Sequence, residues 1–513
     1  MALFHKRDVF IILLIISSYL IIGTGLHGDD LTVISKMKNI PLNEFLTTPL
    51  DMSIFGPVSY YLYWWAYYFL GDDYLIIYDL IKILTMVVSI FYVYKFATNY
   101  LTENRALLAS ILFVFYPVHE ATTYWYMTSS YILSPSLIMF GHYLIDRDSR
   151  YKGTLFATLG VFSGYMSPPY IFGLSVIFLV KKETKKALLF IFPGFLYLIY
   201  YFFIKFQTNV ERRISHNLDA LDYLKQLITQ PISALDAIVG PSYWLKAIFA
   251  IQSIGWISIL IAIFISSYFI LSKTVLLEKP KVSKELIFGL ASVLILSFFM
   301  YALTGLYQHS PFNLGNRSTV YVSLFLAFML AMFLRSSKLS YIFLILMFLF
   351  PNFGLSDHWK GWNKNQLNII SNISSNQELK KIEKNSTFIV LGNTYSKLGP
   401  YSHIEFFSMP WHAKSVFKEY LKTTEIIPLT PHIEINDNIL TDIKRPEFRK
   451  KIRKNIYLYY TEDDKLKKIS NDELTKLVGQ EKKIFRHWVQ LFKNTFIADM
   501  IIRLSPRLSY LFI

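Results

Sequence analysis

Apolar runs long enough to cross a membrane recur along the sequence from residue 8 to residue 354 and then stop. The hydrocarbon core of a bilayer is about 30 Å thick, and a helix of about 20 apolar residues spans it. The sequence therefore predicts an all-α polytopic membrane domain over residues 1–354. We expect about eleven transmembrane helices in it, at residues 8–26, 75–95, 106–117, 130–145, 153–166, 169–180, 187–204, 246–271, 286–305, 319–334 and 339–354.

The charges between these runs indicate which side of the membrane each loop faces. Lys and Arg outnumber Asp and Glu by 52 to 36, and short basic loops such as 147–152 and 181–186 alternate with loops that carry few basic residues. Because basic residues accumulate in cytoplasmic loops, we expect a cytoplasmic N-terminus and an extracytoplasmic C-terminal domain. The cytoplasmic membrane of a bacterium or archaeon is the expected location. We expect membrane lipids as partners and no nucleic acid.

One apolar stretch does not fit as a span. Residues 57–70, PVSYYLYWWAYYFL, are shorter than a spanning helix and crowded with Tyr and Trp. Such amphiphilic aromatic side chains prefer the level of the lipid head groups. We therefore expect interfacial helices within residues 31–70, on the outer face of the membrane.

The last part of the chain, residues 355–513, has the pattern of a soluble mixed α/β domain. Short runs of β-branched and aromatic residues predict strands, and helical periodicity predicts two helices. The predicted strands are Ser386–Leu391, His432–Ile435 and Asn455–Tyr460, and the predicted helices are Ala413–Lys422 and Asp472–Leu477. The chain has no Cys, which excludes disulfides, thiolate metal sites and cysteine nucleophiles.

Polar residues cluster at the expected outward ends of the spans, first at His27-Gly28-Asp29-Asp30, directly after the first span. Two adjacent carboxylates repel each other, and burying them at a membrane boundary is costly. This cost favours a functional site. The alternative is a cap for the helix that we expect to start at Leu31, because Asp accepts backbone N–H bonds at a helix N-terminus.

Two more polar clusters follow in the next outward loops. His119-Glu120 is the second, and an interfacial loop with incidental polar residues is its alternative interpretation. The third runs from Gln308 to Ser318 and contains His309, Asn316 and Arg317. Arg317 is the only basic residue of the predicted outer loop 306–318. Its alternative role is to extend its side chain to the lipid head groups.

Taken together, this arrangement resembles the GT-C superfamily of polytopic glycosyltransferases, and in layout the protein O-mannosyltransferases and the bacterial lipid A aminoarabinose transferases. An acidic pair opens the first outer loop, an aromatic interfacial helix follows, and an Arg precedes a late span. These motifs are Asp29-Asp30, Gly56-Pro57-Val58-Ser59-Tyr60-Tyr61 and Asn316-Arg317-Ser318. The basic residue that such enzymes often place just after the acidic pair is missing here, where Thr32 and Val33 stand.

The resemblance implies transfer of a sugar from a polyprenyl-phosphate donor to a hydroxyl of a glycan, lipid or protein acceptor, with inversion at the anomeric carbon. It implies that Asp29 is the base and that Asp30 orients the acceptor or binds a divalent metal, Mg or Mn, together with Glu120. For the donor phosphate it points to Arg317, Lys36 and Asn316. For substrate contacts it points to His27, Tyr60, Tyr61, His119, Glu120 and His309.

Two other functions fit a polytopic chain. A transporter or flippase for a polyprenyl-linked glycan usually carries internal repeats and polar breaks at mid-membrane, whereas here the polar clusters lie at span ends. A glycan polymerase of the O-antigen type normally relies on Arg-rich outer loops. The acidic pair after the first span favours the transferase over both.

Overall fold

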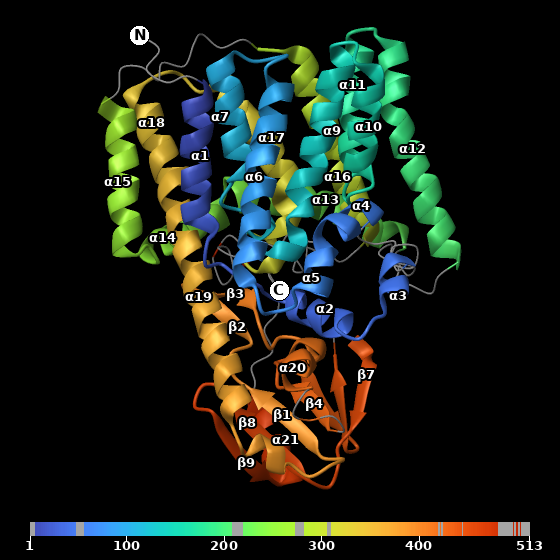
Figure 1. Cartoon of the computed structure of the whole chain (residues 1–513), viewed down its shortest axis with the longest axis vertical. Coiled ribbons are helices and arrows are strands. Elements are labelled where there is room, and N and C mark those ends of the chain that lie inside the picture. The colour runs from blue at the N-terminus through green and yellow to red at the C-terminus, as the bar shows by residue number, and fades with distance from the viewer. Residues whose placement is uncertain are drawn as a thin grey trace.

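Helices fill one end of the molecule and three small sheets fill the other, as Figure 1 shows. The computed structural model describes residues 6–47, 56–207, 219–271, 282–304, 309–418, 421, 424–443 and 445–480, with residues 496, 499, 500 and 503. A single long helix joins the two ends (Figure 1).

The helical end forms a bundle whose members run mostly along the long axis of the molecule (Figure 1). Helices occupy each of the eleven segments predicted as spans. They are α1 (Lys6–Ile21), α6 (Leu75–Ala97), α7 (Glu103–Val114), α9 (Ser130–Asp146), α10 (Arg150–Val161), α11 (Pro168–Val180), α12 (Thr184–Gln207), α14 (Pro241–Gln252), α15 (Trp256–Leu271), α16 (Lys284–Thr304), α17 (Val320–Phe333) and α18 (Lys338–Leu344) with its continuation.

Six helical segments within the described residues are long and apolar enough to cross a membrane. They are Leu75–Ala97, Thr184–Phe203, Ala220–Gln252, Lys284–Thr304, Leu314–Phe333 and Lys338–Ser375. Others are shorter than a helix that spans a bilayer. Helix α7, for example, has 12 residues, or about 18 Å at 1.5 Å per residue. The count of eleven crossings therefore stays a prediction.

The predicted span 246–271 is wrong as a single helix. It is divided between the end of α14 and α15, with residues 253–255 between them. The backbone N–H of Gly255 donates a hydrogen bond of 2.8 Å to Oδ2 of Asp357. This bond satisfies a backbone group that a continuous helix would have used internally. Helix α13 (Ala220–Ile238) precedes α14.

Small residues let neighbouring helices of the bundle approach closely. A Cβ on Gly141 of α9 would lie 2.7 Å from the backbone of α10, and one on Gly160 of α10 would lie 2.8 Å from the Ser134 carbonyl of α9. The Ser134 hydroxyl donates a 2.7 Å bond to the carbonyl of Gly160. Because lipid tails are as apolar as the side chains, such close packing, and not burial from water, holds helices together in a membrane.

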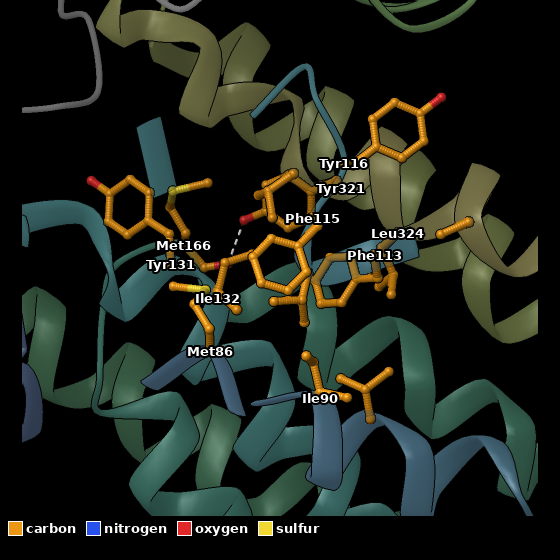
Figure 2. Close-up of a cluster of buried hydrophobic side chains, with 14 of the residues drawn as sticks. Met86, Ile90, Phe113, Phe115, Tyr116, Tyr131, Ile132, Met166, Tyr321 and Leu324 are labelled. Atoms are coloured by element: carbon orange, nitrogen blue, oxygen red, sulfur yellow. Dashed lines mark hydrogen bonds between the residues drawn. The ribbon is translucent and has the colours of Figure 1, made fainter. Parts of the chain in front are cut away.

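The centre of the bundle is a dense apolar core. Figure 2 shows part of it, where the Tyr321 hydroxyl donates to the backbone carbonyl of Met166. Buried side chains from four helices meet in this region: Met86, Ile90, Phe113, Ile132 and Leu324.

Short helices lie between α1 and α6, where we predicted interfacial helices. They are α2 (Asp29–Met37), α3 (Leu42–Thr47), α4 (Pro57–Ser59), a π-helical turn (Tyr60–Trp64) and α5 (Trp65–Phe69). Tyr60 and Tyr67 are buried, whereas Tyr61, Leu62 and Phe69 are exposed. This division gives the aromatic segment one face toward the protein and one apolar face turned away from it.

Helix α18 continues without a break through a π-helical turn (Ile345–Leu349) into α19 (Phe350–Ser375). It therefore runs through residue 354, where the sequence placed the end of the membrane domain. Polar side chains of α19 bond the end of α1 and the backbone that follows it. Ser356 donates 2.6 Å to the Leu20 carbonyl, and Asn363 donates 3.0 Å to the Gly23 carbonyl.

The C-terminal region is a mixed α/β domain, as predicted. Its main sheet has the strand order β4 (Glu425–Pro428), β1 (Thr387–Leu391), β8 (Ile456–Tyr460), β9 (Lys465–Ile469). Strand β1 is parallel to both neighbours, and β9 is antiparallel to β8. The remaining elements are the hairpin β2 (Tyr395–Leu398) and β3 (Tyr401–Glu405), the sheet β5 (Ile433–Asn436), β6 (Ile439–Asp442) and β7 (Arg445–Lys451), and the helices α20 (Pro410–Phe417) and α21 (Asn471–Gln480).

The β2–β3 hairpin attaches this domain to the helical bundle. Leu398 and Ile404 are fully buried and belong to the core of the bundle. The Tyr401 ring lies 4.4 Å from that of Phe312. At the hairpin tip Gly399 has φ +58°, and a Cβ there would lie 2.6 Å from the ring of Phe249 in α14. Only glycine fits this contact.

A buried ion pair on α6 fixes the backbone that leads out of α1. Asp79 and Lys82 are 2.8 Å apart and fully enclosed. Asp79 accepts bonds from the backbone N–H groups of Gly23 (2.7 Å) and Gly25 (3.2 Å). Lys82 donates 2.9 Å bonds to the carbonyls of Gly25 and Tyr124. The pair thus joins the segment after α1 and the segment between α7 and α9 to one helix.

We expect Lys82→Met to destabilise the protein by about 3–5 kcal/mol, because removing one partner leaves a buried charge uncompensated. Thermal unfolding in detergent measures the effect. Lys38→Met is the matched control, since Lys38 pairs with Asp72 at 2.9 Å on the surface, where such a pair contributes about 0–1 kcal/mol. Equal losses in the two variants would contradict the structural role of Lys82.

Candidate functional site

Three segments that carry the predicted polar clusters meet around Gly28. Gly28 precedes α2 with φ +54°, a conformation that glycine adopts at no steric cost. A Cβ there would lie 3.1 Å from Cδ1 of Leu314 and 3.3 Å from the ring of Trp125. Trp125 belongs to the segment between α7 and α9, and Leu314 to the segment that leads into α17. This contact places the predicted acidic pair, which follows Gly28, beside the other two polar clusters.

Asp29 is the accessible member of the acidic pair, with 42% of its side chain exposed. Its Oδ1 accepts a 2.6 Å bond from Nε1 of Trp411 and lies 2.9 Å from Nε2 of His412. Partial burial alone would raise the pKa of Asp29. The hydrogen bond and the charge of His412, together with the hydrogen bond from Trp411, outweigh burial and lower this pKa to about 2. The Arg317 charge contributes to the same shift.

Asp30 has the opposite environment, because it is fully buried. Its Oδ1 accepts a 2.5 Å bond from the Tyr67 hydroxyl, and its Oδ2 accepts a 2.8 Å bond from the backbone N–H of His27. Burial raises the pKa of Asp30 to about 7 despite these two bonds. Asp30 thus holds the turn before α2. It is not the helix cap that the sequence left open, because α2 starts at Asp29 and its N-cap residue is Gly28, with no side-chain cap hydrogen bond.

Arg317 lies in a 3₁₀ helix, Leu314–Thr319, that leads into α17. Its guanidinium donates a 2.7 Å bond to the Leu314 carbonyl and stands 5.4 Å from the centre of the Trp125 ring. Trp125 is therefore the common neighbour of Gly28 and Arg317. Of the phosphate-binding residues predicted with Arg317, Lys36 is exposed near the end of α2 and Asn316 is buried.

Glu120 lies in a buried polar network that unites the bundle with the C-terminal domain. Its Oε2 pairs with Nζ of Lys246 on α14. Its Oε1 accepts a 2.7 Å bond from Nδ2 of Asn316 and lies 2.9 Å from Nε2 of His403 on β3. Burial raises the pKa of Glu120, but Lys246 and His403 outweigh burial and lower it.

The histidine of this network has a defined proton position. Nδ1 of His403 accepts a 3.2 Å bond from the backbone N–H of Asn313. The proton of the neutral ring is then on Nε2, which faces Glu120. In this network the polar atoms of Glu120 and Asn316 contact other protein groups. Glu120, which we predicted to contact substrate, and Asn316, which we predicted to contact the phosphate, therefore already have partners within the protein.

The predicted histidines differ in what surrounds them. His27 is buried, with Nδ1 2.6 Å from Oε1 of Gln366 on α19, and burial lowers its pKa to about 3. His119 contacts the Thr122 hydroxyl and the Phe113 carbonyl, each at 2.8 Å. His309 is buried beside Tyr301, and within the described residues neither of its ring nitrogens has a hydrogen-bond partner.

The two predicted tyrosines tie the aromatic segment to α3. The Tyr60 hydroxyl donates 3.0 Å to the carbonyl of Phe45, and the Tyr61 hydroxyl donates 2.8 Å to the carbonyl of Leu46. Both hydroxyls are therefore occupied by backbone.

The donor set does not fit the divalent metal that we predicted between Asp30 and Glu120. Among the described residues, no group of three or more His, Asp or Glu side chains is arranged to hold a metal ion. Both oxygens of Asp30 bond Tyr67 and His27, whereas those of Glu120 face Lys246, Asn316 and His403. The oxygens of Asp30 and of Glu120 are thus engaged by separate sets of protein partners.

Sequence reasoning missed the contributions of the C-terminal domain, His403, Trp411 and His412. These side chains are far from Asp29 and Glu120 along the chain, and no local pattern links them. The sequence offers one local signal for the helix that carries Trp411 and His412, which is Pro410, because proline is common in the first turn of a helix. Lys246 is the first residue of the predicted span 246–271, and no sequence pattern links it to Glu120.

Neither a protein-family model nor a curated protein sequence matches the chain. The subtypes that the sequence indicated, a protein O-mannosyltransferase or a lipid A aminoarabinose transferase, stay predictions.

Two solved structures to which the chain is similar come from Archaeoglobus fulgidus. One is an oligosaccharyltransferase tethered by a disulfide bond to an acceptor peptide containing the NVT sequon; it is 10% identical over 82% of this chain and 64% of its own, with a TM-score of 0.37. The other is the archaeal oligosaccharyltransferase AglB in complex with an inhibitory peptide and a dolichol-phosphate; it is 11% identical over 82% of this chain and 65% of its own, with a TM-score of 0.35. The chain spans just under two thirds of the length of each.

Proposed function

We propose that the chain is a membrane glycosyltransferase of the GT-C kind, which moves a sugar from a polyprenyl-phosphate donor to an acceptor hydroxyl. The observation that carries this proposal is that a half-exposed, ionised Asp29 and Arg317 lie on either side of Gly28 and Trp125, near enough for the Arg317 charge to help lower the pKa of Asp29. A carboxylate and a cation close together are what a displacement at a sugar phosphate requires.

The chemistry follows from these two groups. The acceptor oxygen attacks the anomeric carbon, and Asp29 takes the hydroxyl proton. The bond between the anomeric carbon and the phosphate oxygen breaks, and its electron pair leaves with the lipid phosphate. Arg317 stabilises that phosphate through parallel N–H bonds. A direct displacement of this kind inverts the anomeric centre, whether the sugar is a hexose or a pentose.

Asp29 and Arg317 are the site residues that we retain from the sequence. Lys36 is exposed on the same helix as Asp29 and remains a candidate for the phosphate. We propose that Asp30, His27 and Glu120 support the site through the contacts described above. The mechanism proposed here routes no step through a metal ion.

We also propose that residues 1–354 form the membrane domain and that the domain within 355–513 lies on the extracytoplasmic side, with a cytoplasmic N-terminus. The site then faces the outer surface, where a lipid-linked donor and its acceptor meet. Helix α19 extends from the one domain into the other and connects them without a break.

Single cysteines test this sidedness, because the chain has no Cys of its own. Lys152 and Glu462 are both exposed, one on α10 and one in the C-terminal domain. In intact cells a membrane-impermeant maleimide should label Glu462→Cys and leave Lys152→Cys unlabelled until the membrane is opened. The reverse pattern would place the site on the cytoplasmic side.

Transfer itself is tested in detergent with a panel of labelled polyprenyl-phosphate sugars. We expect Asp29→Asn to lower turnover about 10²–10⁴-fold, the typical loss for a general base, with unchanged thermal stability. Asp73→Asn, an exposed carboxylate before α6, is the matched control and should transfer normally. Full turnover in Asp29→Asn would remove Asp29 from the mechanism, and no transfer by the wild-type chain from any donor would reject the proposed function.

Arg317 should require its guanidinium and not merely its charge. We expect Arg317→Lys to lose much of the transfer activity and Arg317→Ala to lose more, because only Arg binds a phosphate with two parallel bonds. Donor titrations separate weaker donor binding from slower turnover. Arg335→Ala, on an exposed Arg between α17 and α18, is the control. A nearly silent Arg317→Lys would favour a head-group contact instead.

The pH profile separates the two aspartates. The pKa of Asp29 is lowered to about 2 and that of Asp30 is raised to about 7. If Asp29 is the base, it stays ionised on acidification from pH 7 to pH 5, and turnover should change little over that interval. If ionised Asp30 were needed, turnover would fall about tenfold for each pH unit below 7. Initial rates at saturating donor, with stability checked at each pH, decide between them.

A further inference from the structure

We infer that Trp411 and His412 of the C-terminal domain are positioning residues for Asp29, which hold one carboxylate oxygen and leave the other toward the acceptor hydroxyl. This inference deepens the proposed function and rests on it. Its basis is the set of contacts between α20 and the start of α2.

Two donors from one turn of α20 converge on a single oxygen atom. Nε1 of Trp411 donates to Oδ1 of Asp29 at 2.6 Å, and Nε2 of His412 lies 2.9 Å from the same atom. Within the described part of the chain, no hydrogen bond reaches Oδ2. Because the Asp29 side chain is half-exposed, its second oxygen is the one available to a substrate.

The two donors are themselves held firmly. Helix α20 begins at Pro410, and its buried Ala413 and Phe417 belong to the core of the C-terminal domain. His412 is 3% exposed at its side chain. The Thr32 hydroxyl of α2 donates a 3.4 Å bond to the Trp411 carbonyl, so backbone as well as side chains join the two helices.

Anchoring one oxygen fixes the plane of the carboxylate. Oδ2 then has one direction from which a hydroxyl can approach, and the proton passes to Oδ2 while the new glycosidic bond forms and the lipid phosphate leaves. Correct orientation of a catalytic group lowers the activation barrier of the reaction considerably. A misplacement of about 1 Å can cost about 10²-fold in rate. The C-terminal domain thereby becomes a part of the active site.

Kinetics of single variants test the positioning role. We expect Trp411→Phe and His412→Leu each to lower kcat about 10-fold to 100-fold, with little change in the KM for donor. His412→Gln should recover part of the loss, since its amide N–H can replace the ring donor. His432→Leu makes the same substitution in the same domain, beside β5, and should leave kcat unchanged.

A double-variant cycle separates positioning from simple structural support. In an Asp29→Asn background, adding His412→Leu should cause no further loss of residual transfer, because His412 acts through Asp29. Independent losses that multiply would overturn the inference while leaving the proposed function intact. A normal kcat in both Trp411→Phe and His412→Leu would also overturn the inference.

The contact is also testable without any activity. Asp29→Cys with Trp411→Cys, in a chain free of other Cys, should be joined by a short bismaleimide, whereas Lys152→Cys with Trp411→Cys should not. Failure of the first pair to cross-link, with both thiols shown to be reactive, overturns the inference. A cross-link without any wild-type transfer would instead reject the proposed function, and the positioning role with it.

Discussion

The structure depends on the side chains that hydrogen-bond the backbone N–H and C=O groups between α1 and α2, at the end of the bundle. This segment has no regular structure, and its polar groups lie among apolar side chains. Asp79 and Lys82 of α6 bond it from one side. On the other side Asn363 of α19 bonds the Gly23 carbonyl, and Ser356 of α19 bonds Leu20 at the end of α1. An unpaired backbone group in such surroundings is costly, so these four side chains set the direction in which Asp29 points.

The neighbouring carboxylates of Asp29 and Asp30 differ in exposure and in hydrogen-bond partners because of this arrangement. Asp30 turns into the protein and becomes part of the turn before α2, whereas Asp29 turns toward α20 and stays half-exposed. The difference comes from their places in a helical turn, because successive residues point about 100° apart. Adjacent identical residues can therefore divide a structural and a chemical role between them.

The sequence predicted the general organisation of the chain. Apolar runs located the helices of the bundle, and short runs of β-branched and aromatic residues located β1 and β8, because burial imposes these patterns locally. The break before α15 was missed, since a hydrogen bond from Gly255 to Asp357 leaves no local pattern. Asp29 and Arg317 stand out in the sequence by their position at predicted span ends, and their roles stay proposals. Trp411 and His412 do not stand out, because only the folded chain brings them to Asp29.

The dependence of Asp29 on α20 has a consequence for the order of assembly. Domains generally fold from the N-terminus during synthesis, so the bundle is complete before residues 411 and 412 emerge from the ribosome. Until the β2–β3 hairpin docks and His403 reaches Glu120, Asp29 lacks the donors of α20. The orientation of its carboxylate is therefore acquired only when the C-terminal domain has folded against the bundle.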